Sequence, residues 1–342
     1  MTRRGTDYDE SDVRIRPNRR GSRARTKERP AHADAVRARV LAVDRGRYHV
    51  RCGSGAEATE VLAMKARELG RKGIVVGDVV ALVGDTSGDP DALARIVRVE
   101  PRRTVLRRTA DDNDPVERVI VANVDQLVVV TSLADPEPSP RLVDRCLVAA
   151  YDAGLDPLLV LTKADLTDPA PFLAAYAPLE VPWVVTSRFE TDIDGLAAVR
   201  QRLSGRVSVL VGHSGVGKST LVNALVPGAD RSTGSVNDVT GRGRHTSSSA
   251  IALPLPGDQG WVVDTPGVRS FGLAHIDLHR IVENFPDLAA GTDDCPRGCT
   301  HDEPGCRLDA WVASGRAGPA GAARLDSLRR LLRARSGSTG EV

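Results

Sequence analysis

At 342 residues and a net charge of +2, the chain is long enough for two or three domains but carries no strong overall field for nucleic acid. No apolar run reaches the roughly 18 residues of a membrane span, and the Arg-rich start lacks the apolar stretch of a signal peptide. We therefore expect a cytoplasmic protein without a membrane partner. Three of the five cysteines crowd between Cys295 and Cys306, which in a reducing compartment indicates a metal site rather than disulfides.

Residues 1–33 are predicted to form a disordered basic arm. Residues 1–31 hold ten Arg and Lys against five Asp and Glu, with almost no large apolar side chains, so they cannot bury enough surface to fold alone. RNA phosphate is one partner for such an arm, and a solvated tail without a specific role is the alternative. A short disordered tail is expected at 335–342.

Residues 34–103 are predicted to form a small barrel of the oligonucleotide-binding type. Tyr48 is the only Phe, Trp or Tyr in this span, which disfavours base stacking, whereas Arg and Lys suit contacts with a folded RNA backbone. The barrel prediction rests on five β-like runs separated by turn signals, namely Val36–Val43, Tyr48–Cys52, Thr59–Leu62, Val75–Val83 and Leu93–Val99.

Residues 104–274 alternate apolar strands with helical stretches such as Pro140–Ala153. This pattern is typical of an α/β domain in which a mostly parallel sheet is covered on both faces. The expected strands are Val124–Thr131, Pro157–Leu161, Trp183–Thr186, Val207–Val211 and Trp261–Val263.

The strand Val207–Val211 leads into a loop of the form G-x-x-x-x-G-K-S, and a helix begins at Lys218. Glycines let backbone N–H groups approach a phosphate without a Cβ in the way, and a helix N-terminus favours the anion. Lys218 would reach the β- and γ-phosphates, and the Ser219 hydroxyl would coordinate Mg²⁺. The alternative is a glycine-rich turn that binds nothing. The predicted phosphate-binding residues are Gly212, His213, Ser214, Gly215, Val216, Gly217, Lys218, Ser219 and Thr220.

Asp264 follows the strand Trp261–Val263 and opens an Asp-Thr-Pro-Gly motif. A carboxylate at a strand end can hold Mg²⁺ directly or through water, and the Gly267 N–H can meet a γ-phosphate. Alone, such a motif marks an ordinary turn. Downstream of a phosphate loop, it predicts the second half of a nucleotide site.

A base-reading motif is predicted at Thr162, Lys163, Ala164 and Asp165. The Asp165 carboxylate can accept hydrogen bonds from the N1 and N2 hydrogens of guanine, whereas adenine has no such pair. The Lys163 stem can lie across the base, and Thr186–Arg188 stand where such proteins make a backbone contact with it. The alternative is a strand end with a solvated Lys and Asp.

The motif order indicates a circularly permuted domain, because Asp165 precedes Gly212 although most GTPases place this motif downstream of the phosphate loop. Permutation preserves a packed sheet when the domain termini lie close together.

The segment Thr233–Ser249 is expected to order around the γ-phosphate, with Thr246 completing the Mg²⁺ shell; a flexible surface loop is the alternative. Val268 occupies the position where Ras-like proteins place a water-orienting Gln, and an aliphatic side chain cannot orient water. His245 is the nearest substitute, although a histidine in a basic loop can equally contact RNA or do nothing.

Cys295, Cys299, His301 and Cys306 supply three thiolates and one imidazole, a suitable set for closed tetrahedral zinc. Such a structural site would stabilise a small α-helical domain over residues 275–334 that has little core of its own. Free or redox-active thiols are the alternative. Cys52 and Cys146 lie in apolar runs and are expected in the core.

With these motifs, the chain resembles the ribosome small-subunit-dependent GTPase A family (RsgA) from about Ala35 to Arg333. The resemblance rests on the permuted order, the cysteine/histidine cluster and the runs Gly212–Thr220, Gly241–Thr246 and Asp264–Leu273. It implies an N-terminal oligonucleotide-binding barrel, a permuted GTPase and a zinc domain. The family also places a histidine at the position of His245, which makes this residue a catalytic candidate.

Two departures from the family pattern stand out. Thr162 replaces the usual Asn and can supply only a subset of its contacts. The gaps Cys-x3-Cys and His-x4-Cys are each about one residue shorter than usual in the zinc cluster.

The leading hypothesis is a monomeric, Mg²⁺-dependent GTPase that cycles between GTP and GDP. The resemblance implies that it binds the small ribosomal subunit and its rRNA, assists late maturation, and hydrolyses GTP faster on the subunit. One rival is a structural RNA-binding protein whose nucleotide site only regulates docking. The other, a P-loop ATPase or kinase, requires that Asp165 be ignored.

Overall fold

The structure, a computed structural model, describes residues 32–70, 73–109, 116–187, 193–229, 250–265, 273 and 275–336. Residues 34–342 cluster as one compact unit. The predicted arm lies almost wholly outside the described ranges, as does most of the predicted tail. Within these ranges, every helix is too short or too polar to cross a membrane.

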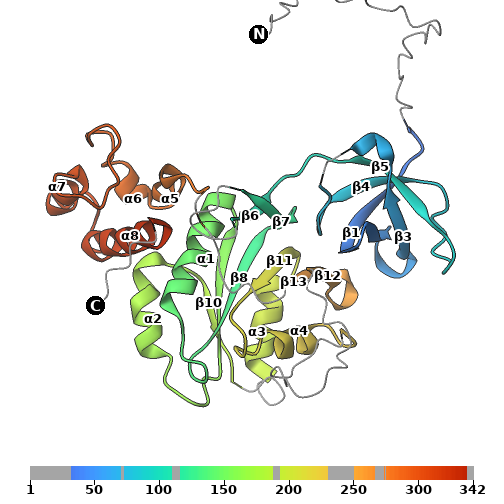
Figure 1. Ribbon diagram of the computed structural model, residues 1–342. Coiled ribbons are helices and arrows are strands. Elements are labelled where there is room, and N and C mark those ends of the chain that lie inside the picture. Colours follow the sequence, from blue (N-terminus) through green and yellow to red (C-terminus); the bar gives the residue numbers. More distant parts are fainter. Residues whose placement is uncertain are drawn as a thin grey trace, which may run out of the picture. The chain divides into compact units, whose positions relative to one another are not determined.

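Five strands close into the predicted N-terminal barrel (Figure 1). They follow the order β1-β2-β3-β5-β4, and β4 returns to pair with β1. Residues alternate along β2, so that Tyr48, Val50 and Cys52 are buried while Arg47 and His49 face solvent. The strands are β1 (Val36–Asp44), β2 (Arg47–Cys52), β3 (Thr59–Lys65), β4 (Val79–Val83) and β5 (Ala94–Val99), with short 3-10 turns η2 (Gly55–Glu57) and η3 (Arg67–Leu69).

The fourth strand is shorter than the predicted run from Val75 to Val83. The buried Asp78 carboxylate accepts a hydrogen bond from the Val75 N–H at 2.9 Å and closes a turn there. Arg102 donates two hydrogen bonds to the same carboxylate, from Nε at 2.7 Å and from Nη2 at 2.8 Å. This local pairing competes with the sheet ladder, so the strand begins only at Val79.

The central sheet has the predicted parallel character. Strands β10, β9, β8, β11 and β13 run parallel in that order, and β12 adds an antiparallel strand beside β13. All seven residues of β8 are buried, as expected for a strand covered on both faces. The strands are β8 (Gln126–Ser132), β9 (Asp156–Thr162), β10 (Trp183–Val185), β11 (Arg206–Val211), β12 (Ile251–Pro254) and β13 (Gly260–Asp264), with the turn η5 (Pro256–Asp258) between the last two.

Helices cover the two faces of this sheet (Figure 1). Leu127 and Val129 of β8 pack in one hydrophobic cluster with α1, whereas Val128 and Val130 pack in another with α3 and α4. Helix α1 has the predicted bounds because Ser139 caps its first turn and Gly154 ends it with a φ of +64°. The helices are α1 (Pro140–Ala153), α2 (Ala170–Tyr176) with the turn η4 (Ala177–Leu179), α3 (Ile193–Leu203) and α4 (Lys218–Leu225).

A two-stranded hairpin that the sequence patterns did not predict, β6 (Val105–Arg108) and β7 (Arg118–Ala122), joins the barrel to the central sheet. Its end packs tightly on the barrel, because the Ala122 N–H donates to the Val76 carbonyl at 3.0 Å. Gly77 lies at this contact with a φ of +85°, and a Cβ there would overlap the Ala122 carbonyl oxygen. The barrel and sheet also meet at one strand pair, Ala42 with Ile251.

The C-terminal helices share the core of the central domain. Leu328 and Leu331 of α8 belong to the same hydrophobic cluster as Leu147 of α1. Polar contacts reinforce this packing, since Arg145 Nη1 donates to the Ala334 carbonyl at 2.8 Å. The helices are α5 (Leu278–Glu283), α6 (Pro286–Ala289), α7 (Arg307–Ala313) and α8 (Gly321–Ser336). The described C-terminal helices thus share a hydrophobic cluster with the central domain.

Candidate nucleotide site and metal centre

The predicted phosphate loop lies between β11 and α4, at the carboxyl edge of the parallel sheet. Gly215 and Gly217 adopt φ values of +83° and +88°, which L side chains rarely take. Gly212 is required for a different reason, because a Cβ there would overlap the Val130 carbonyl oxygen on β8. The glycine spacing therefore reflects both backbone conformation and the close approach of two strands.

Lys218 and Asp264 come together in this site. Both are buried, and Lys218 Nζ donates a hydrogen bond to Asp264 Oδ1. The register of β11 with β13 accounts for the pair, since Leu210 lies beside Asp264 at the same sheet edge. An ammonium group can bind phosphate and a carboxylate can bind a divalent cation, so the pair suits a nucleotide site.

Thr265 has a structural role that the sequence did not suggest. Its hydroxyl donates to the Leu210 carbonyl at 2.7 Å and so fastens the end of β13 to β11. Thr265 is buried, and its place directly after Asp264 is the one sequence feature that points to it.

The predicted base-reading residues lie at the end of β9 and contact the phosphate loop. Buried Thr162 donates its hydroxyl to the Val216 carbonyl at 2.7 Å. Thr162 therefore fastens the base loop to the phosphate loop, whatever contact it makes with a base. The Ala164 N–H donates to the Thr186 carbonyl at 3.1 Å, which joins this loop to the one after β10.

Lys163 and Asp165 project from this loop. Lys163 has a φ of +60°, and its ammonium donates to the Asp135 carbonyl. Asp165 is exposed at the same sheet edge. The segment after β8 that includes Asp135 was not predicted as part of the site. Its Pro136 lies beside Gly215 and, with His213, lines a cavity of about 100 Å³.

Several predicted site residues lie outside the described ranges. They are His245 and Thr246, which lie between the phosphate loop and β12, Gly267 of the acidic motif, and Arg188 of the loop after β10.

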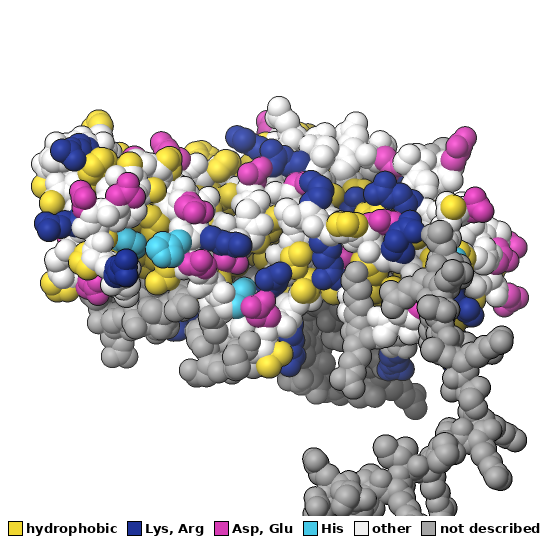
Figure 2. Space-filling model, turned by 90° about the horizontal axis from the view of Figure 1, so that it is seen from above, with side chains coloured by type: hydrophobic (Ala, Val, Ile, Leu, Met, Phe, Trp, Pro, Cys, Tyr) yellow, Lys and Arg dark blue, Asp and Glu magenta, His cyan; other side chains and the backbone are white. Residues whose placement is uncertain are grey.

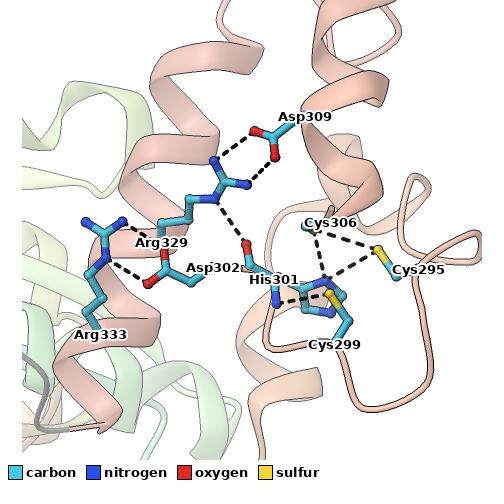
Figure 3. A network of polar contacts seen from close by, with 8 residues as sticks. All are labelled: Cys295, Cys299, His301, Asp302, Cys306, Asp309, Arg329 and Arg333. Atoms are coloured by element: carbon cyan, nitrogen blue, oxygen red, sulfur yellow. Dashed lines mark hydrogen bonds and ion pairs between the residues drawn. The ribbon is translucent and has the colours of Figure 1, made fainter. Parts of the chain in front are cut away.

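The cysteine/histidine cluster can hold one metal ion. One ligand atom from each of its four residues, Cys295, Cys299, His301 and Cys306, lies within 4.8 Å of the others (Figure 3). Cys295 Sγ lies 3.8 Å from Cys306 Sγ and 3.7 Å from His301 Nδ1. A tetrahedral ion with metal–sulfur bonds of about 2.3 Å requires ligand atoms about 3.8 Å apart. The short gaps between these residues therefore do not prevent their convergence, and Nδ1 is the histidine nitrogen that faces the sulfurs.

The protonation of these groups follows their burial. Burial raises the pKa of the Cys299 and Cys306 thiols and lowers the pKa of the His301 imidazole. A neutral imidazole is the form that ligates a metal, and a cation among thiols deprotonates them despite their burial. The two other cysteines, Cys52 and Cys146, are buried in the core as predicted, and burial raises the pKa of Cys146 to about 12.

The strand order and the motif order together define a circularly permuted P-loop GTPase, in which the base-reading strand β9 precedes the phosphate-loop strand β11. The model of one family, RsgA GTPase, matches residues 99–274. The chain belongs to this RsgA GTPase family, and it is a GTP-hydrolysing enzyme.

Relatives with the name "Small ribosomal subunit biogenesis GTPase RsgA" cover most of the chain. The Pseudomonas aeruginosa PAO1 protein is 40% identical over 269 residues, which are 76% of this chain and 75% of the relative. The Gemmatimonas aurantiaca protein is 38% identical over 249 residues, 72% of this chain and 80% of the relative. The family is thus one of ribosome biogenesis GTPases.

Two solved structures share the fold. YjeQ from Thermotoga maritima is 25% identical with a TM-score of 0.61, covering 89% of this chain and 99% of that one. YloQ, described as a circularly permuted GTPase, is 21% identical with a TM-score of 0.62, covering 92% of this chain and 99% of that one.

Proposed function

We propose that this GTPase binds the small ribosomal subunit through its rRNA, assists late maturation of the subunit, and hydrolyses GTP faster when bound. The observation that carries this proposal is the match, at about 40% identity over three quarters of the chain, to small ribosomal subunit biogenesis GTPases. It would act as a monomer in the cytoplasm, away from membranes.

The proposed nucleotide site takes GTP and GDP. Asp165 selects guanine, supported by Thr162, Lys163 and Ala164, and the loop Gly212–Thr220 holds the phosphates, with Lys218 on the β- and γ-phosphates. Ser219, Thr246 and Asp264 would surround Mg²⁺, and the Gly267 N–H would meet the γ-phosphate. The buried proximity of Lys218 and Asp264 supports this assignment.

His245 is the proposed catalytic residue for the attacking water, because Val268 cannot orient water. Replacing His245 by Ala should reduce subunit-stimulated hydrolysis at least about tenfold and leave GTP binding unchanged. Single-turnover hydrolysis and nucleotide titration on the same preparation separate the two effects. Unchanged turnover would remove His245 from the mechanism.

The proposed metal is one structural zinc ion, held by Cys295, Cys299, His301 and Cys306. The donor set of three sulfurs and one nitrogen supports zinc, and four protein ligands leave no open position for chemistry. Bound zinc would stabilise the proposed domain 275–334. The other proposed domains are the barrel at 34–103 and the GTPase domain at 104–274. The disordered segments would be the arm 1–33 and the tail 335–342.

Nucleotide state is proposed to reach the metal domain, because only a short segment separates the acidic motif from Cys295. The GTP and GDP forms should then differ in affinity for small subunits. Equal affinities would contradict this switch.

The outer face of the barrel supports RNA contact. Strand registers align Arg47 of β2 with Met64 of β3, and Met64 with Arg95 of β5. All three side chains are exposed, and neither arginine forms an ion pair with another described residue. Two guanidinium groups on either side of an apolar side chain suit a phosphodiester backbone that crosses the strands. Elsewhere, as Figure 2 illustrates for one face, Lys and Arg are interspersed with Asp and Glu, so local groups matter more than net charge.

Cosedimentation with isolated small and large subunits tests the partner. The wild type with a non-hydrolysable GTP analogue should sediment with small subunits only. Charge reversal of both Arg47 and Arg95 to Glu should weaken this binding at least about tenfold, because two phosphate contacts become repulsive. The matched control is charge reversal of Arg202, an exposed arginine on α3, which should change binding less than about twofold. Equal binding to both subunits would contradict the proposal.

A further inference from the structure

Two arginines of α8, Arg329 and Arg333, lie near the cluster of Cys295, Cys299, His301 and Cys306 (Figure 3). Arg329 and Arg333 lie one helical turn apart, so both point to the same side of α8. Arg333 makes a two-point ion pair with Asp302, at 2.8 Å from Nε and 2.7 Å from Nη2. Arg329 makes the equivalent pair with Asp309, at 2.9 and 2.8 Å from its two terminal nitrogens.

Among the described contacts of these two arginines, the one to a metal-binding residue is made by Arg329. Its Nε donates to the His301 carbonyl at 3.1 Å. On the other side, the His301 N–H donates to Cys299 Sγ at 3.4 Å. His301 has a φ of +62°, a conformation that costs an L residue free energy and therefore needs support from its surroundings. The two hydrogen bonds, one to the carbonyl and one from the N–H of His301, hold its backbone on both sides of the Cα.

Charge gives Arg329 a second role. A divalent cation with three thiolates and a neutral imidazole carries one net negative charge, which is costly to hold where His301 and Cys306 are buried. The Arg329 side chain is only 16% exposed and contacts the His301 carbonyl, whereas its partner Asp309 is 55% exposed. The guanidinium therefore offers a partly buried positive charge beside the proposed anionic centre.

We propose that Arg329 is the positioning residue of the metal centre, holding the His301 backbone in its ligating conformation and offsetting the charge of the metal–thiolate group. This inference rests on the proposed zinc site. The next residue on α8, Arg330, instead pairs with Asp144 of α1. Arg329 and Arg330 therefore face different parts of the protein.

Zinc affinity of the full chain tests this role, measured by competition with a chromophoric chelator. Arg329→Gln should weaken zinc binding about 10- to 100-fold, the usual effect of losing an outer-shell partner. Arg333→Gln is the matched control, because it removes the same kind of two-point ion pair from the same helix, and that pair involves Asp302 rather than a metal-binding residue. It should change the affinity less than about threefold, since a surface pair contributes little. Arg329→Lys, which keeps the charge, should recover part of the loss.

Cobalt substitution supplies a readout that general loosening would not move. The visible spectrum of the Co²⁺-loaded wild type should show a tetrahedral thiolate centre, and Arg329→Gln should shift its bands while Arg333→Gln leaves them unchanged. GTP affinity, unchanged in both variants, verifies folding. If the wild type and the Arg329→Gln variant bind zinc equally well, the proposed role of Arg329 is wrong while the zinc site stands. Failure of the wild type to bind zinc would overturn the metal site itself. Equal weakening in both arginine variants would overturn the specific role of Arg329.

Discussion

At the scale of single residues, Thr162 illustrates how one hydroxyl joins two motifs that are far apart in the chain. It stands where most GTPases have Asn, and it donates to the Val216 carbonyl inside the phosphate loop. The hydroxyl also lies 3.4 Å from the Thr131 carbonyl, so its hydrogen is directed at backbone carbonyls, and we propose that guanine selection falls to Asp165. In this proposal, the departure from the family pattern concerns the connection between the two loops more than the choice of base.

Thr162→Val should weaken GTP binding about 5- to 100-fold, because the variant keeps the shape but leaves a buried carbonyl without its donor. Thr162→Ser is the matched control and should bind nearly as the wild type does. Titration with a fluorescent GTP analogue measures both. Discrimination against xanthosine triphosphate should stay as in the wild type. A Val variant with wild-type affinity would show that the bond is dispensable.

Residue types and their order predicted the members of the site but not their contacts. Lys218 and Asp264 were each assigned to nucleotide binding from a motif, yet their pairing depends on the register of β11 with β13, which no motif specifies. Similarly, Cys-x3-Cys and His-x4-Cys predicted the ligand set, but neither spacing specifies that His301 Nδ1 faces the sulfurs or that His301 has a left-handed backbone. Such contacts follow from tertiary packing, which a single sequence does not reveal.

At the scale of elements, strong local signals decided which predictions succeeded. Helix α1 has the predicted bounds because Ser139, Pro140 and Gly154 punctuate it. The hairpin β6–β7 and the strand β12 were missed because they are short, and β6 and β7 also carry charged residues. Their pairing comes from neighbouring strands rather than from their own patterns.

The contact between the barrel and β7 depends on Gly77. Gly77→Ala should lower the free energy of unfolding by at least about 3 kcal/mol, because the added methyl overlaps the Ala122 backbone in addition to straining φ. Gly46→Ala has nearly the same φ but open space around it, so its cost should be only about 1 kcal/mol. Thermal unfolding of the two variants gives the comparison. Equal losses would contradict the tight contact.

The packing of α8 on α1 should depend on pH through Asp144. Burial raises the pKa of Asp144 to about 6, although the nearby Arg330 partly offsets this effect. The folded state therefore holds this proton more tightly than the unfolded chain, whose carboxyl has a pKa near 3.8. Consequently, the group's contribution to stability falls as pH rises from about 4 to 6.

Asp144→Asn removes this titration. Relative to the wild type, the variant should gain about 1 to 3 kcal/mol of unfolding free energy between pH 4.5 and pH 7. Urea unfolding at several pH values measures the difference. A constant difference across this range would contradict the raised pKa.

At the scale of the whole molecule, the barrel, the permuted sheet and the metal-binding helices are joined through shared packing. Gly77 and the hydrogen bond from the Ala122 N–H to the Val76 carbonyl join the barrel to β7, while α8 contacts both the cysteine/histidine cluster and α1. The fold class and the GTPase activity were predicted from motif order, because a base-reading motif upstream of a phosphate loop is typical of permuted GTPases. Partners depend on surfaces, which motifs do not describe.

We propose that GTP hydrolysis by this protein is completed on the small ribosomal subunit. Multiple-turnover hydrolysis by the full chain, measured alone and with isolated small or large subunits, tests it most directly. Slow turnover alone, strong stimulation by small subunits and none by large ones are the predicted results. Unstimulated turnover with small subunits present would contradict the claim and favour a protein whose nucleotide site only regulates docking.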